Sequence, residues 1–504
     1  MNGTRRGLEH MITKTFRRAL TGALSLSVLL GTTALSAQDY PIAPDRAATE
    51  TILLDHIKVL ASDEYGGRLP GTEGGQKTQA YIIEKLESYG YQPGYKGEWR
   101  QKVMLEGQVP GALVLTIGDT EIAGDDAFAL SLSDSPLMAS GAELVALGSP
   151  EDIAATQGKV AVITNPMAAQ SLLGPAMEGG ALGALVLVEQ EPIWNQFRAF
   201  ASRPQWNLAG GDMEEEEEQP LVALVGPTTS AAILAALGTD SAALGERSGE
   251  VIGTSTFSSD AESLTAESAN VVGMLPGTKP GSGAIIMMGH WDHLGSDCAP
   301  ETEEGRICNG AADNASGIAA ILETSRRLAM GPRLERDIYI MGTTAEEMGL
   351  LGARYFADNP PIPLEDFQAA LNIDMISIAP AGTPLTVIGW GDTPMDAPIK
   401  LAAAALNRTI DVGEESAKYV RRQDGWALMN KGVPAVLVSG AFADDDILDA
   451  FMGTRYHKPS DQVHDELEIS GMAEDVPLYV VLMAMLANPD RYEKPEGWEF
   501  DRGE

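Results

Sequence analysis

The sequence is poor in basic residues. Its 35 lysines and arginines stand against 72 aspartates and glutamates, which gives a net charge of −37 over 504 residues. A chain this acidic repels the phosphate backbone, so nucleic acid is excluded as a partner. Hydrophobic residues nevertheless make up 44% of the chain and charged residues only 21%. This balance excludes a wholly disordered protein, and the length predicts roughly two to four folded domains.

The sequence also lacks a comfortable membrane span near its beginning. The apolar run 19–34 is short and is interrupted by glycines. Basic residues precede this run, and the small residues Ser36 and Ala37 follow it. That order is typical of a secretory signal peptide, which we assign to residues 1–37. We therefore expect a periplasmic or secreted protein that has no stable membrane insertion once the signal is removed.

Cysteine is nearly absent, with only Cys298 and Cys308 in the whole chain. A lone pair at this spacing excludes a zinc ribbon. In an oxidising compartment the simplest interpretation is one local disulfide, and two free thiols are the alternative.

Changes in the pattern of apolar, polar and turn-forming residues along the chain predict its domains. Residues 38–125 contain a helical pattern that ends at Gly90, and residues 126–256 change to short β-like runs with turns rich in alanine and glycine. Residues 257–495 alternate short apolar runs with helical stretches, and 496–504 form a tail. We predict an α/β fold with a mixed central sheet flanked by helices, and a small inserted β-rich α+β domain at 126–256. The main strands are expected at 271–275, 284–289, 337–342, 369–375, 385–388 and 435–439, with helices at 318–328 and 398–406.

Histidine is scarce as well, with six in the chain, yet two of them follow the single run 284–289. They are His290 and His293, with Asp292 between them. Acidic residues follow two other predicted strands, namely Glu346 with Glu347 and Asp374. Ligands of α/β sheets gather beyond the carboxyl ends of the strands, so these side chains are candidates for one site.

Two further polar clusters contain Asp313 and His457. Several carboxylates that converge without a cation would repel one another, whereas divalent metal ions would neutralise them. Nitrogen and carboxylate ligands without thiolate suit Zn²⁺, with Mn²⁺ or Co²⁺ as alternatives. Taken singly, Asp313 could be only a helix N-cap, and His293 could equally orient a ligand or be structural. His56 and His464 are interpreted as surface or packing residues.

The adjacent pair Glu346 and Glu347 has a property of its own. In an extended segment consecutive side chains point to opposite sides, so one can bind metal while its neighbour reaches a water molecule. We therefore expect one glutamate to be a ligand and the other a base.

These motifs resemble those of the M28 zinc aminopeptidases, and they occur in the family's order. The middle segment resembles the protease-associated domain that many members carry as an insertion. The likeness extends from Leu60 to Arg491. The matching stretches are Gly-His290-Trp-Asp292-His-Leu-Gly, Gly-Ala-Ala-Asp313-Asn-Ala-Ser-Gly, Ala-Glu346-Glu347-Met-Gly, Asn-Ile-Asp374-Met-Ile and Tyr-His457-Lys-Pro-Ser-Asp461.

The resemblance implies two zinc ions per chain and peptide substrates with a free N-terminus. His290 and Asp374 would bind one zinc, Glu347 and His457 the other, and Asp313 would bridge both. Glu346 would be the general base, and the Asp292 carboxylate would orient His290. One stretch departs from the family: where a histidine often follows Ser-Asp, the sequence here reads Arg422-Gln423-Asp424-Gly425-Trp426. The departure bears on substrate preference.

Three other functions compete with an aminopeptidase. A carboxypeptidase and a glutaminyl cyclase share the fold, and the carboxypeptidase would need a basic residue such as Arg421 or Arg422 to hold a substrate carboxylate. A receptor-like binding protein would have lost ligands, and none is missing from the motifs. Serine hydrolysis is disfavoured because the chain has no Gly-x-Ser-x-Gly motif, and it has no His-Glu-x-x-His motif either. The sequence leaves the oligomeric state unknown.

Overall fold

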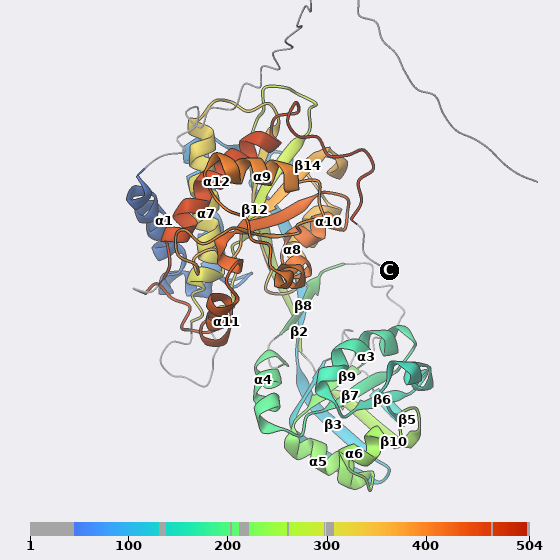
Figure 1. Ribbon diagram of the computed structural model, residues 1–504. Helices are drawn as coiled ribbons and strands as arrows, with labels where there is room; N and C mark the ends of the chain where they lie inside the picture. Colours follow the sequence, from blue (N-terminus) through green and yellow to red (C-terminus); the bar gives the residue numbers. More distant parts are fainter. Residues whose placement is uncertain are drawn as a thin grey trace, which may run out of the picture. The chain divides into compact units, whose positions relative to one another are not determined.

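The computed structural model describes residues 45–130, 138–201, 204–210, 221–259, 262–296, 298, 307–464 and 467–500. The expected signal peptide and the last four residues of the expected tail lie outside these ranges. Within them the strands form one open sheet and one closed barrel (Figure 1). No helix of the described ranges combines the length and the apolar character needed to cross a bilayer.

The open sheet is mixed, which confirms the predicted fold class. Its strand order is β15-β16-β14-β12-β13-β11-β2-β8, and β1 pairs with β11. The central strands β16, β14, β12 and β13 run parallel, and the other pairs are antiparallel. The bounds are β1 Gln92–Pro93, β2 Arg100–Val109, β8 Gln205–Leu208, β11 Glu262–Leu275, β12 Ala284–His290, β13 Asp337–Thr343, β14 Phe367–Asn372, β15 Thr386–Ile388 and β16 Ala435–Ser439.

Continuous apolar runs explain the parallel strands. Every residue of β12, β14 and β16 is buried, as expected for strands covered on both faces. Strand β11 is longer than the predicted 271–275, because its first half alternates in exposure and pairs antiparallel with β2. That alternating half lacks the apolar run from which the strand was predicted.

Helices cover both faces of the sheet. On one face Phe356 of α8, Leu428 of α10 and Phe451 of α11 pack in one cluster with Ile286 and Met288 of β12. Helices α1, α2, α7, α9 and α12 pack together as a second group (Figure 1). The bounds are α1 Arg46–Leu60, α2 Glu73–Tyr89, α7 Gly317–Met330, α8 Leu351–Asp358, α9 Asp396–Ala405, α10 Gly425–Met429, α11 Asp445–Thr454 and α12 Ser470–Leu486.

Local signals set the ends of helix α2. The Thr72 side chain accepts a hydrogen bond from Gly75 N at the N-cap, and Gly90 at the other end has a φ of 92°. Glycine adopts this left-handed conformation without the steric cost of a Cβ atom. The predicted stop at Gly90 is therefore where the helix ends.

The barrel has the strand order β10-β3-β4-β9-β7-β6-β5 and encloses its own apolar core, which includes Leu115, Leu144 and Phe257. Its strands extend from Gly111 to Ser259, so they begin before the expected boundary at 126. Its kinship with protease-associated domains stays a prediction. The bounds are β3 Gly111–Ile117, β4 Thr120–Leu130, β5 Met138–Ala146, β6 Val160–Ile163, β7 Gly183–Leu187, β9 Leu221–Val225, β10 Val251–Ser259, α3 Pro166–Glu178, α4 Glu191–Ala201, α5 Pro227–Ala236 and α6 Ser241–Gly245.

Candidate active site

Two neighbouring parallel strands bring His290 and Asp374 together. His290 is the last residue of β12, and Asp374 follows the end of β14, which pairs with β12. His290 Nε2 lies 3.3 Å from Asp374 Oδ1. Both side chains are buried, because the strands that carry them are covered by helices. The strand-end argument from the sequence thus predicted this contact.

Asp313 lies between two histidines. Its Oδ1 is 3.2 Å from His290 Nε2, and its Oδ2 is 3.5 Å from His457 Nε2. Asp313 belongs to a distorted turn, Ala311–Ser316, that precedes helix α7, and its own φ and ψ are not helical. The Asp461 carboxylate accepts hydrogen bonds from the amides of Ala312 and Asp313 at 2.9 and 3.0 Å. Asp313 is therefore no N-cap, and a neighbouring carboxylate holds its backbone.

Glu346 and Glu347 lie in a turn after β13, so the expectation of an extended segment was wrong. The Asp292 carboxylate accepts hydrogen bonds from both of their amides, at 3.2 and 3.4 Å, and stabilises this turn. The two side chains still face different partners. Glu346 Oε2 is 4.0 Å from His290 Nε2, whereas Glu347 faces His293 and His457.

Asp292 therefore acts differently from the expectation. His290 Nδ1 contacts the backbone oxygen of Asp292 at 3.2 Å, and no described hydrogen bond joins His290 to the Asp292 carboxylate. The carboxylate is committed to the amides of Glu346 and Glu347. Asp292 thus positions the histidine through its main chain and the glutamates through its side chain.

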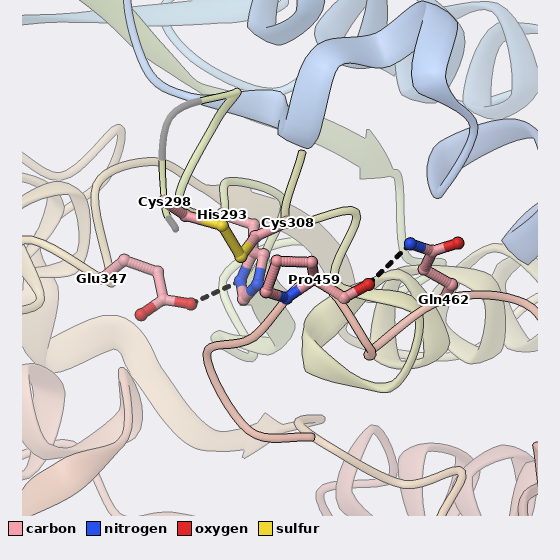
Figure 2. The surroundings of a disulfide bond; sticks show 6 residues. All are labelled: His293, Cys298, Cys308, Glu347, Pro459 and Gln462. Atoms are coloured by element: carbon pink, nitrogen blue, oxygen red, sulfur yellow. Dashed lines mark hydrogen bonds and ion pairs between the residues drawn. A yellow bond between two sulfur atoms is a disulfide. The ribbon is translucent and has the colours of Figure 1, made fainter. Parts of the chain in front are cut away.

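Two imidazoles face Glu347. His457 Nε2 is 2.8 Å from Glu347 Oε2, and His293 Nδ1 is 2.6 Å from Glu347 Oε1. Figure 2 shows the second contact, together with the Cys298–Cys308 disulfide that closes the loop after His293. The disulfide is the local pairing that the sequence predicted. The carboxylate can only accept, so a hydrogen bond to it places the His293 proton on Nδ1.

Arg68 is the main residue of this region to which the sequence assigned no role. It is buried, and its guanidinium donates to the backbone oxygens of Trp291 at 2.8 Å and Gly310 at 3.0 Å. It also donates to Leu60 O and Asn309 O. Arg68 thus joins the segment before α2 to the strand end of His290 and to the turn of Asp313. The sequence feature that could have pointed to Arg68 is its place in the stretch Gly-Gly-Arg68-Leu-Pro-Gly, which belongs to the resemblance.

The other two histidines of the described residues, His56 and His464, are packing residues, as the sequence predicted. His56 is buried in α1, with Nδ1 2.7 Å from the hydroxyl of Tyr81. His464 contacts Arg455. Neither belongs to the group of converging ligands among the described residues.

The donor set fits divalent metal ions. Ligand atoms of His290, Asp313 and Asp374 all lie within 4.8 Å of one another, and those of His293, Asp313 and Glu347 do the same. His457 Nε2 is buried and lies between the Glu347 and Asp313 carboxylates, but it forms no hydrogen bond of regular geometry with either, which suits a nitrogen that shares a cation with them. Asp313 is common to both groups, and nitrogen with carboxylate oxygen is a donor set that Zn²⁺ accepts.

The electrostatics separate the two glutamates. Burial raises the pKa of Glu346 well above its ordinary value. Burial would raise the pKa of Glu347 as well, but His457 and His293 outweigh it and lower that pKa to about 2. For His290, burial lowers the pKa, and the stronger attraction of Glu346 and Asp374 raises it well above 6.5. Two titratable neighbours with pKa values pushed apart are typical of a base beside an ionised ligand.

A pocket opens at these residues. His290, Asp313, Glu346 and Asp374 form its polar part. Asp424, from the stretch that departs from the family pattern, is buried next to the lining residue Gln423 in sequence and accepts a hydrogen bond from the Thr343 hydroxyl. Burial raises the pKa of Asp424 to about 6.

Comparisons with solved structures support the fold. An aminopeptidase from Aneurinibacillus sp. strain AM-1 superposes with a TM-score of 0.59 at 20% identity, covering 90% of this chain and 97% of that one. A zinc aminopeptidase from Bacillus subtilis, BSAP, gives a TM-score of 0.50 at 16% identity over 86% and 94% of the two chains. The mixed sheet and its helices therefore define the chain as a protein of the zinc-aminopeptidase fold class.

The sequence comparisons then give the family. Residues 270–474 match the family described as peptidase family M28, so this part of the chain is similar to the members of that family. The chain is also 26% identical over 379 residues to the probable lipoprotein aminopeptidase LpqL of Mycobacterium tuberculosis. That match covers 72% of this chain and 66% of the relative. These matches confirm the resemblance to the M28 family that the motifs at His290, Asp313, Glu346, Asp374 and His457 predicted. The likeness of the barrel to a protease-associated domain stays a prediction.

Proposed function

We propose that the protein is a zinc aminopeptidase that removes N-terminal residues from peptides. The observation that carries this proposal is the convergence of five side chains from separate stretches of the chain: His290, Asp313, Glu347, Asp374 and His457. Three of them, His290, Asp313 and Asp374, line the pocket. The fold and the names of its relatives, which are aminopeptidases, support the same activity.

In this proposal the chain holds two zinc ions. His290 and Asp374 would hold one, Glu347 and His457 the other, and Asp313 both, since its two oxygens face different histidines. His293 would orient Glu347 rather than bind metal, because its Nδ1 is within hydrogen-bond distance of Oε1. The bound ions would supply the Lewis acidity that activates water and polarises the scissile carbonyl.

Glu346 would perform the proton transfers. It lines the pocket beside His290, and its raised pKa lets its carboxylate accept a proton from the attacking water. The same carboxyl group would then donate that proton to the leaving amine. Asp292 would keep Glu346 in place through the amide hydrogen bond at 3.2 Å. The acidic side of the pocket would attract the ammonium group of the substrate.

Replacing Glu346 tests the proposal. In Glu346→Gln we expect turnover of aminoacyl anilides to fall at least about hundredfold, because the amide cannot accept the proton. Bound zinc, measured by elemental analysis, should match the wild type. The control is Glu365→Gln at an exposed position, which should keep full activity. A zinc-loaded Glu346→Gln protein as active as the wild type would disprove the base assignment, and faster hydrolysis of amino-blocked peptides would disprove the aminopeptidase.

We also propose that the protein acts in the periplasm or outside the cell. The disulfide supports this, because such bonds persist in oxidising compartments. The signal peptide predicted at 1–37 is consistent with it and lies outside the described residues. Fractionation followed by sequencing of the mature N-terminus would test it, and full-length protein in the cytoplasm would contradict it.

A further inference from the structure

One residue that lines the pocket of the candidate active site carries a positive charge. Apart from the polar group around His290, its lining consists of methionine, isoleucine, leucine, phenylalanine and tyrosine side chains together with Gln423 and Arg422. Arg422 is the one lysine or arginine in this lining. A permanent positive charge at an apolar pocket is stabilised by a negatively charged group, so a carboxylate that pairs with Arg422 is expected.

The backbone on either side holds Arg422 in place. Arg422 is the last residue of a 3₁₀ helix, Glu414–Arg422, and its guanidinium lies over the ring of Tyr419, 5.6 Å from the ring centre. The next residue, Gln423, is buried and accepts a hydrogen bond from Gly425 N at 2.7 Å. Asp424 is buried against Thr343. The backbone that carries the Arg422 side chain is therefore held in place by these contacts.

The guanidinium of Arg422 has no carboxylate partner among the side chains that the structure describes. Among the residues whose side chains the structure describes, no aspartate or glutamate oxygen lies within 4.0 Å of it, although the side chain is exposed. Its planar donors match a carboxylate in a bidentate arrangement. Glu346 and Asp374, which also line the pocket, would repel a substrate carboxylate, and Arg422 is the lining side chain whose charge would attract one.

We propose that Arg422 binds a carboxylate of the substrate and makes the enzyme selective for peptides that carry one close to the scissile bond. The inference rests on the proposed peptidase function. Two sources provide the same chemistry: the side chain of an acidic N-terminal residue, and the C-terminal carboxylate of a dipeptide.

The experiment compares two pairs of near-isosteric substrates with the zinc-loaded enzyme. Glutamyl and glutaminyl anilides differ in the side-chain carboxylate, and leucyl-glycine and its amide differ in the terminal one. We expect the wild type to prefer the charged member of one pair by kcat/KM. In Arg422→Gln that preference should fall about tenfold or more, mainly through KM, since a charge-assisted hydrogen bond is lost. Because the readout is a ratio, it does not depend on the active fraction.

Matched variants separate a charge effect from a structural one. Arg422→Lys should retain part of the preference, because it keeps the charge without the fork. Arg421→Gln should behave as the wild type, since Arg421 lies over Trp426 and is not in the pocket lining. If Arg422→Gln loses the preference within the glutamyl pair, Arg422 binds the acidic side chain of the N-terminal residue. If it loses the preference within the dipeptide pair, Arg422 binds the C-terminal carboxylate. An unchanged ratio in both pairs overturns this inference alone, whereas hydrolysis of none of the four substrates overturns the proposed function as well.

Discussion

At the scale of single residues, the geometry of the site depends on which imidazole each carboxylate oxygen faces. The two oxygens of Glu347 face two different imidazoles, and the two oxygens of Asp313 do the same. A carboxylate held from both sides loses little rotamer freedom when it binds an ion. Residues that only orient a ligand therefore contribute to metal affinity without touching the metal.

His293 provides a test of that principle. In His293→Ala, Glu347 loses the hydrogen bond at 2.6 Å, and we expect zinc affinity to fall about 10- to 100-fold. Competition with a chromophoric chelator measures it. His56→Gln, a buried histidine of helix α1, is the matched control and should leave affinity unchanged. Equal zinc affinity in the His293 variant would show that the contact does not orient the ligand.

His56 also predicts a pH dependence of stability. Burial lowers its pKa from 6.5 to about 4. Below pH 6.5 the unfolded chain binds a proton at this residue that the folded chain does not bind until about pH 4, so the free energy of unfolding falls as the pH falls through this window. The effect is at most about 3 kcal/mol.

Urea unfolding at pH 7 and at pH 5 measures the effect. We expect the wild type to lose more stability between the two values than His56→Gln does, because glutamine does not titrate. Above pH 6.5 both states are neutral at His56, and the pH dependence of the two proteins should be the same. Parallel losses between pH 7 and pH 5 would contradict the assignment.

At the scale of elements, loops rather than strands complete the site. The parallel strands β12 and β14 position His290 and Asp374. Asp313 lies in the distorted turn Ala311–Ser316, and Glu347 and His457 lie in turns between elements. Turns need tertiary contacts to hold one conformation, and here Asp292, Asp461 and Arg68 provide them.

Arg68 is the element-scale test, because it joins three segments. In Arg68→Met the backbone oxygens of Trp291, Leu60 and Gly310 lose a buried donor, and we expect unfolding to become easier by about 3–5 kcal/mol. Chemical denaturation measures it. The exposed Lys102→Met, which removes a surface pair with Glu267, should cost less than about 1 kcal/mol.

If Arg68→Met does not fold, Arg68→Lys provides the same test of stability. Lysine retains the charge but offers its donors from one point, so we expect a loss between those of Met and wild type. Stability of Arg68→Lys equal to that of the wild type would show that the fork of the arginine is not needed.

At the scale of the whole molecule, metal should stabilise the fold. Ions bound by residues from five segments favour the folded state, by about 2.7 kcal/mol at a free concentration of one hundred times Kd. We expect a chelator to lower Tm by several degrees and zinc to restore it. Glu346→Gln, which keeps all five proposed ligands, should respond in the same way. A Tm that is indifferent to chelator and zinc would contradict the proposed metal centre.

The sequence by itself determined the fold class, the strand positions of the parallel sheet and the polar residues that follow its strands. Those features follow from local patterns: continuous apolar runs make buried strands, and polar residues directly after them lie at the same edge of the sheet. The Cys298–Cys308 pair was predicted for a similar reason, since its two cysteines are ten residues apart in one loop.

Only the tertiary structure decided how the gathered residues divide their tasks. Arg68 donates to carbonyls 223 and 242 positions away, and no local pattern encodes such a contact. The same holds for the Asp292 carboxylate, which bonds to the amides of Glu346 and Glu347 rather than to its neighbour His290. Hydrogen bonds between distant segments depend on where folding places each backbone amide and carbonyl, and residue types in a sequence do not specify that geometry.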